Sequence, residues 1–93
     1  MKMPDLEFLK ECVIESTKDD YENISTLEPE IRKWAEEERK AFSADALLHA
    51  LDFLVREGRL GAFRFSNDQG CFVESSLDEV PVAELWFKSR KLH

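Results

Sequence analysis

Residues 43–74 read SADALLHALDFLVREGRLGAFRFSNDQGCFVE, and the spacing of the apolar residues changes within this stretch. Up to Gly58 the leucines recur at helical spacing, with Ser43 suited to the N-cap and Gly58 to a left-handed C-terminal cap. Beyond Gly58 the apolar residues alternate, and a polar turn ending in Gly70 separates two such runs. The predicted elements are a helix over 43–57, a strand over 60–65, a turn over 66–70 and a strand over 71–74.

Two further helices are predicted before this stretch, over 4–17 and 28–40, because their apolar residues fall at helical spacing. Pro29 is expected in the first turn of the second helix, where its missing N–H removes no bond within the helix. The polar connection between these helices leaves room for a very short strand at 21–24.

The segment over 78–90 fits two structures. Asp78 suits a helix cap, Pro81 suits a first turn, and the following apolar residues fall at helical spacing. We therefore expect a helix here. The alternative is a third strand through 84–87.

The order of these elements resembles the winged helix-turn-helix family. The resemblance is strongest over 46–60, where helical leucines lead through an L-x-x-x-G-x-L pattern into the first strand. It implies an α+β, mainly α, three-helix winged-helix domain with a two-stranded β-hairpin wing and a C-terminal helix or strand. We expect one domain over 1–93, with its core over 5–75 and an extension over 76–93.

In DNA-binding members of that family the third helix enters the major groove and the wing contacts the backbone or the minor groove. Carried over to this chain, the exposed side of helix 43–57 presents Asp45, His49, Asp52 and Arg56. Two aspartates on this side disfavour DNA, because a carboxylate near phosphate is repelled, although an aspartate can accept a hydrogen bond from cytosine.

If the chain binds nucleic acid, the basic residues around the wing at 59–74 and near the C-terminus are the candidates for its contacts, together with His49. The candidate basic residues are Arg56, Arg59, Arg64, Lys88, Arg90 and Lys91. The alternative is that they are ordinary solubilising charges, which we favour.

Ten of the 93 residues are aromatic, which is generous for a small core. Three short helices cannot cover every aromatic residue of the wing, and an uncovered apolar patch marks an interface. The candidate interface residues are Phe53, Phe63, Phe65, Trp86 and Phe87. Either the C-terminal segment folds back over the wing, which we favour, or a homodimer forms through 78–90 and the wing.

Catalytic, metal and cofactor sites are not expected. Cys12, His49, Cys71 and His93 lack the paired spacing of a zinc site, and no nucleophile elbow, phosphate-binding loop or dinucleotide fingerprint is present. Both cysteines lie among apolar neighbours, so we expect them to be small buried residues.

The composition narrows the class of protein. The chain has 93 residues, a net charge of -7 and no apolar run near the about 18 residues that span a bilayer. No secretory signal precedes the first amphipathic segment, so we expect a cytoplasmic protein without membrane contacts. Residues 1–30 hold nine acidic and three basic residues, so most of the acidity lies outside the helix that would read DNA bases.

These observations favour a non-enzymatic interaction or regulatory module that works through protein–protein contacts, with a protein partner or a second copy of itself. The alternative is a DNA-binding transcriptional regulator that uses helix 43–57 and the wing.

Overall fold

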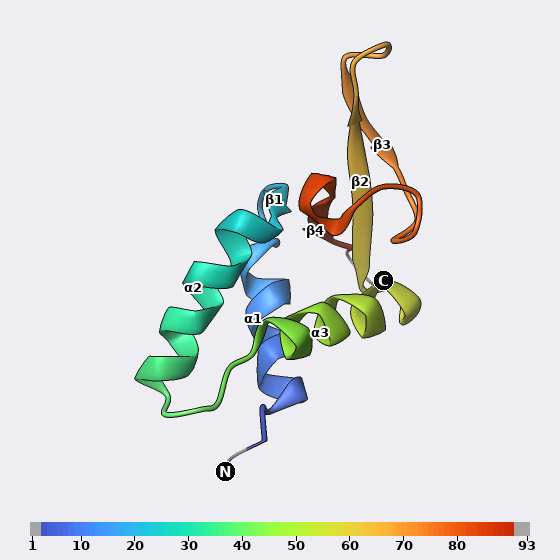
Figure 1. Ribbon diagram of the computed structural model, residues 1–93. Coiled ribbons are helices and arrows are strands. Elements are labelled where there is room, and N and C mark those ends of the chain that lie inside the picture. Colours follow the sequence, from blue (N-terminus) through green and yellow to red (C-terminus); the bar gives the residue numbers. More distant parts are fainter. Residues whose placement is uncertain (1–2, 91–93) are drawn as a thin grey trace.

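The computed structural model describes residues 3–90, which form three α-helices and a four-stranded antiparallel sheet (Figure 1). The helices are α1 (Leu6–Ser16), α2 (Ile24–Glu37) and α3 (Ala44–Arg56). The strands are β1 (Glu22–Asn23), β2 (Leu60–Ser66), β3 (Cys71–Glu74) and β4 (Trp86–Ser89), and a short 3-10 turn, η1 (Val82–Glu84), precedes β4. The α+β class expected from the sequence is confirmed.

The strands are not arranged in the order of the chain. The order across the sheet is β1-β4-β2-β3, so β4 lies between the short β1 and the long hairpin. The register pairs Glu22 with Phe87 on one side of β4 and Ala62 with Phe87 on the other. The hairpin of β2 and β3 projects beyond the helices (Figure 1).

Local sequence signals set the bounds of α3 and the hairpin as expected. The side chain of Ser43 accepts a hydrogen bond from the Ala46 N–H at 3.1 Å and caps α3. Gly58, with φ of 75°, follows the helix, and Gly70, with φ of 68°, ends the hairpin turn. Both angles lie in the left-handed region that glycine adopts without steric cost.

The other two helices begin at different residues from those expected. Asp5 caps α1 by accepting the Phe8 N–H at 3.1 Å, so α1 begins after this residue and not at residue 4. Asn23 caps α2 by accepting the Thr26 N–H at 3.1 Å, so α2 begins at Ile24 and not at residue 28. Pro29 therefore lies inside α2, where it removes one backbone hydrogen bond, and the prediction of a first-turn proline is wrong.

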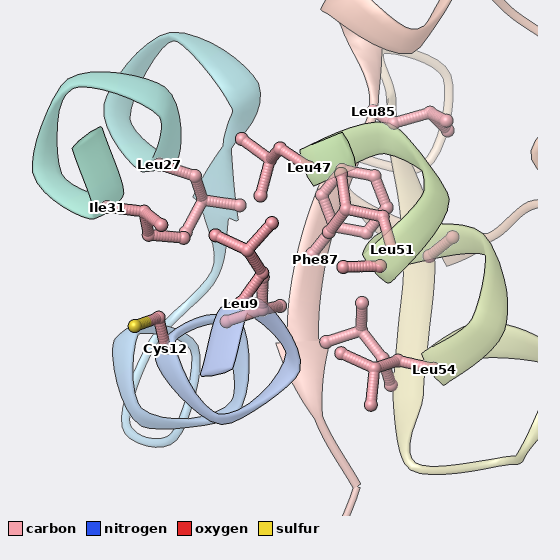
Figure 2. Close-up of a cluster of buried hydrophobic side chains, with 13 residues drawn as sticks. Leu9, Cys12, Leu27, Ile31, Leu47, Leu51, Leu54, Leu85 and Phe87 are labelled. Carbon is pink, nitrogen blue, oxygen red and sulfur yellow. The ribbon is translucent and has the colours of Figure 1, made fainter. Parts of the chain in front are cut away.

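The core lies between the three helices and one face of the sheet. Leu9 of α1, Leu27 of α2 and Leu51 of α3 meet there, all at most 1% exposed. The ring of Phe87 from β4 lies among the leucines of α3, as Figure 2 shows. The core therefore needs the C-terminal segment as well as the three helices.

The expected helix over 78–90 is wrong, and the alternative, a third strand, comes closer. The segment makes one 3-10 turn at η1 and then the strand β4. Leu85 and Phe87 are both fully buried, and residues two apart share one face of a strand but not of a helix. The long-range pairing of β4 with β1 and β2 thus outweighs the local helical spacing.

Candidate interaction surface

The face of the sheet that points away from the helices carries a cluster of aromatic side chains. Directly paired residues of antiparallel strands share a face, and the register pairs Phe65 with Phe72 and Phe63 with Trp86. Tyr21, which precedes β1, contacts two of these rings. We call this set the aromatic face, and its members are Tyr21, Phe63, Phe65, Phe72 and Trp86.

The rings of the aromatic face pack on one another, with Phe72 at the centre. Tyr21 stacks on Phe72 with ring centroids 4.2 Å apart and planes at 16°. Trp86 and Phe65 meet Phe72 edge-on, with centroids 5.3 and 5.6 Å away. Such pairs contribute about 0.5–1.5 kcal/mol each beyond the burial of their area. The cluster is therefore a small second layer of apolar packing outside the main core.

Exposure is concentrated at one end of this face. Phe65 is 49% exposed, whereas Phe63, Phe72 and Trp86 are half-buried. Phe65 lies near the turn end of the hairpin, the part that projects beyond the helices (Figure 1). The aromatic face thus presents one open ring beside a packed cluster. Single-stranded nucleic acid stacks its bases on several free rings in succession, and the aromatic face does not offer such a series.

A glycine and two cations complete the geometry of this face. A Cβ atom at Gly61 would lie 2.6 Å from Cε2 of Phe63, so the absence of a side chain lets that ring lie over β2. Lys88 places its Nζ 5.6 Å from the ring centroid of Tyr21, a cation–π distance. Arg90 forms an ion pair with Glu74 of β3. Both cations are therefore already engaged within the chain.

The exposed side of α3 is the surface that would read bases if the chain bound DNA in the way that DNA-binding winged-helix proteins do. Asp45 and His49 are exposed there. Arg56 places its Nε 3.1 Å from a carboxylate oxygen of Asp52, one helical turn earlier. The one arginine on this side is thus paired with a carboxylate, so the side offers little positive charge for phosphate.

The other basic candidates are spread over several elements. Arg64 on β2 has its Nε 3.9 Å from a carboxylate oxygen of Glu79. Arg59 precedes β2, and its carbonyl accepts the Arg90 N–H at 3.0 Å. Lys91 lies outside the described residues. Among the described candidates, Arg59 and Arg90 therefore lie side by side, and Arg56, Arg64 and Arg90 each face a carboxylate.

Phe53 is a second exposed aromatic residue, on α3, at 46% exposure. The Nζ of Lys10 lies 5.7 Å from its ring centroid and 2.9 Å from a carboxylate oxygen of Glu57. The hydrogen bond to Glu57 raises the pKa of Lys10. Phe53 thus covers a charged pair between α1 and α3 and stands apart from the aromatic face.

Two residues do not lie where the sequence interpretation placed them. Phe87 was a candidate for the interface but is fully buried, because β4 turns this side chain toward α3. Cys71 was expected to be buried and is exposed, since it lies at the projecting end of β3. The prediction of a buried Cys12 is confirmed.

The sequence interpretation omitted two members of the aromatic face from its interface, Tyr21 and Phe72. Their stacking depends on the pairing of β1 with β4, which joins distant parts of the chain. The alternation of Phe63 and Phe65 on the first strand of the hairpin, with Phe72 as the aromatic residue of the second strand, is the sequence signal that points to Phe72.

Other kinds of site find little support in the described part of the chain. Among residues 3–90, no group of three or more His, Cys, Asp or Glu side chains is placed to hold a metal ion. In the same range, no helix has the length and hydrophobicity to cross a membrane. An open depression beside the N-terminus of α1 is crossed by the Lys40–Asp5 ion pair, at 3.1 Å, so its charges compensate each other.

Comparison with known proteins gives no relative: no protein-family model matches the chain, and no curated sequence or solved structure matches it significantly.

Proposed function

We propose that this chain is a non-enzymatic winged-helix interaction module that works through protein–protein contacts on its aromatic face. The observation that carries the proposal is Phe65, 49% exposed at the open edge of a packed aromatic cluster. Interaction sites in proteins are enriched in aromatic residues that are pre-positioned by their neighbours. The contacts of Phe72 with the rings around it hold the aromatic face in place before any partner arrives.

The charge pattern supports protein contacts over duplex DNA. Affinity for duplex DNA comes chiefly from cations that replace the counterions of phosphate. Three of the candidate arginines already face carboxylates: Arg56 faces Asp52, Arg64 faces Glu79 and Arg90 faces Glu74. Each pair would have to be broken, or its acid brought near phosphate, for the arginine to contribute.

Site-specific photo-crosslinking tests the proposal. A photoreactive phenylalanine analogue is introduced at Phe65, and as a matched control at Lys33, an exposed residue of α2. In cells that make the protein, we expect discrete cross-linked protein products from position 65 and none from position 33. Cross-links that disappear on nuclease treatment, or an absence of cross-linked protein at position 65, would overturn the proposal.

A salt titration with labelled random duplex DNA tests the DNA-binding alternative directly. At about 5 µM protein and about 50 mM salt we expect no binding. Binding that weakens steeply with added salt, with a flatter slope when Arg59 and Arg64 are replaced by Ala, would favour the DNA-binding regulator instead.

A further inference from the structure

The outer edge of β3 is open for pairing with another strand. β3 is the last strand of the sheet, and within residues 3–90 its one neighbour is β2. The Ser75 N–H donates to the Ala62 carbonyl at 2.9 Å, and backbone groups of an antiparallel strand alternate in direction. With the observed register, Cys71 and Val73 therefore turn their N–H and C=O groups toward β2. The same groups of Phe72 point out to the open edge.

This edge lacks the devices that protect exposed strands. Natural edge strands carry lysine, proline or bulges, or are very short. β1, at the opposite edge, has two residues and leads directly into α2. β3 has four residues, Cys71–Glu74, without lysine or proline, and its one charge is paired with Arg90.

We propose that the open edge of β3 pairs antiparallel with β3 of a second copy, about a two-fold axis at Phe72, to form one continuous sheet. The inference rests on the proposed function and names its partner as the chain itself. In this register the two Phe72 residues face each other and exchange two backbone hydrogen bonds. Phe65 pairs with Phe72 within each copy, so the two aromatic faces join into one row across the dimer.

Side-chain chemistry favours a second copy as the occupant, because β3 is complementary to itself in this register. On the helix side of the sheet, Cys71 of each copy faces Val73 of the other, apolar against apolar. Glu74 faces Gly70 of the second copy, so no carboxylate faces an apolar ring or another carboxylate. An axis at Val73 would place Phe72 opposite Glu74, and an axis at Glu74 would place two acids together.

Sedimentation equilibrium and amide exchange test the association. A contact of four residues per copy is small, so we expect weak association that is visible between about 10 µM and about 1 mM protein. The average mass should rise from 10.9 kDa toward twice this value. Exchange of the Phe72 N–H should slow at least about five-fold over this range, while the inward-facing Val73 N–H stays unchanged. A constant monomer mass with a constant Phe72 exchange rate would overturn the proposal.

Disulfide trapping tests the register. In the variant Val73→Cys, the new thiol faces the native Cys71 of the second copy in a non-hydrogen-bonded pair. The Cα atoms of such a pair lie about 4.5 Å apart, a separation that a disulfide spans. With oxidised glutathione, we expect peptide mapping to find cross-links between positions 71 and 73 of different copies. The matched control is Asn67→Cys in the exposed turn, which should give no such pairing.

The outcomes separate this inference from the proposed function. A 73-to-73 cross-link, or none in a variant that melts as the wild type does, would overturn the two-fold pairing at Phe72. If the protein stays monomeric but Phe65 cross-links to a different protein, the proposed function stands and the homodimer fails. If the Phe65 cross-link maps to a second copy, both are supported. A monomer without any cross-linked protein contradicts both.

Discussion

The hydroxyl oxygens of Thr17 and Ser89, which are 72 residues apart in the sequence, lie 2.7 Å apart in the structure. Ser89 at the end of β4 also donates its N–H to the Thr17 carbonyl at 3.0 Å and its hydroxyl to the Ile14 carbonyl at 2.8 Å. Thr17 is fully buried. The C-terminal end of α1 and the end of β4 are therefore joined by a group of hydrogen bonds.

Substitution of Ser89 by Ala should lower the free energy of unfolding. The change removes the Ser89 donor from the Ile14 carbonyl, while the Thr17 hydroxyl keeps its hydrogen bond to the Val13 carbonyl at 2.7 Å. A lost hydrogen bond to a buried polar group costs about 1–3 kcal/mol. Urea unfolding followed by circular dichroism measures the change. The control Ser76→Ala, at an exposed residue, should stay within about 0.5 kcal/mol of wild type. Equal effects of the two substitutions would contradict this account of the contact.

Substitution by Ala should lower the free energy of unfolding much more at Phe87, in the core, than at Phe65, on the aromatic face. Phe87→Ala removes a fully buried ring of the core and should cost about 3–5 kcal/mol of unfolding free energy. Phe65→Ala removes a half-exposed ring and its edge contact with Phe72 and should cost about 1–2 kcal/mol, because less of its area leaves water on folding. Denaturant titration of both variants gives the comparison. A larger loss for Phe65 would show that the aromatic face is a folding core.

Replacement of Glu22 by Gln should change how stability depends on pH. Burial, with Asp20 and Glu30 nearby, raises the pKa of Glu22 above its ordinary value of 4.5. The folded state then binds this proton more readily than the unfolded chain does. Stability from this group therefore falls as pH rises from about 4.5 through the raised pKa, and it stays lowered above that. Thermal melts should show Glu22→Gln more stable than wild type at pH 7 and little different near pH 3.5. A variant less stable than wild type at pH 7 would refute this sign.

The two cysteines should react at very different rates with a thiol reagent. Burial raises the pKa of Cys12 to about 11, and the reactive form of a cysteine is the thiolate. Cys71 is exposed. With a chromogenic disulfide at pH 8 we expect one thiol to react at once, and the second only on unfolding. The variant Cys71→Ser should lose the fast phase alone. Two fast thiols in the folded wild type would rule out the buried position of Cys12.

The parts of the fold that the sequence predicted are those with local signals. Ser43 and Gly58 mark the two ends of α3, and Gly70 marks the end of the hairpin turn, through backbone preferences that need no distant partner. β4 was mistaken for a helix because Pro81 and the following apolar spacing suit a helix locally. Its strand conformation depends on pairing with β1 and β2, which no local pattern encodes.

Only part of the aromatic face could be predicted, because its other contacts depend on the pairing of distant strands. Phe63 and Phe65 could be identified because three short helices cannot cover every aromatic residue of the wing, and Trp86 because it lies in the segment expected to meet the wing. The role of Tyr21 could not, because its stacking on Phe72 exists only once β1 lies beside β4. Phe87 was misplaced because a helix at 78–90 gives no reason for adjacent aromatic residues to take opposite faces.

The inner position of β4 has a consequence for how the chain folds during synthesis. Within residues 3–90, backbone pairing connects β1 to the β2–β3 hairpin only through β4, and the pairing of β4 with β1 joins residues more than sixty positions apart. On a ribosome, the three helices and the hairpin emerge before the strand that joins them, so the place of Phe87 in the core stays empty until then. Closing so long a loop is entropically costly and slow. We therefore expect the domain to become stable only after β4 has been synthesised and has paired with both β1 and β2.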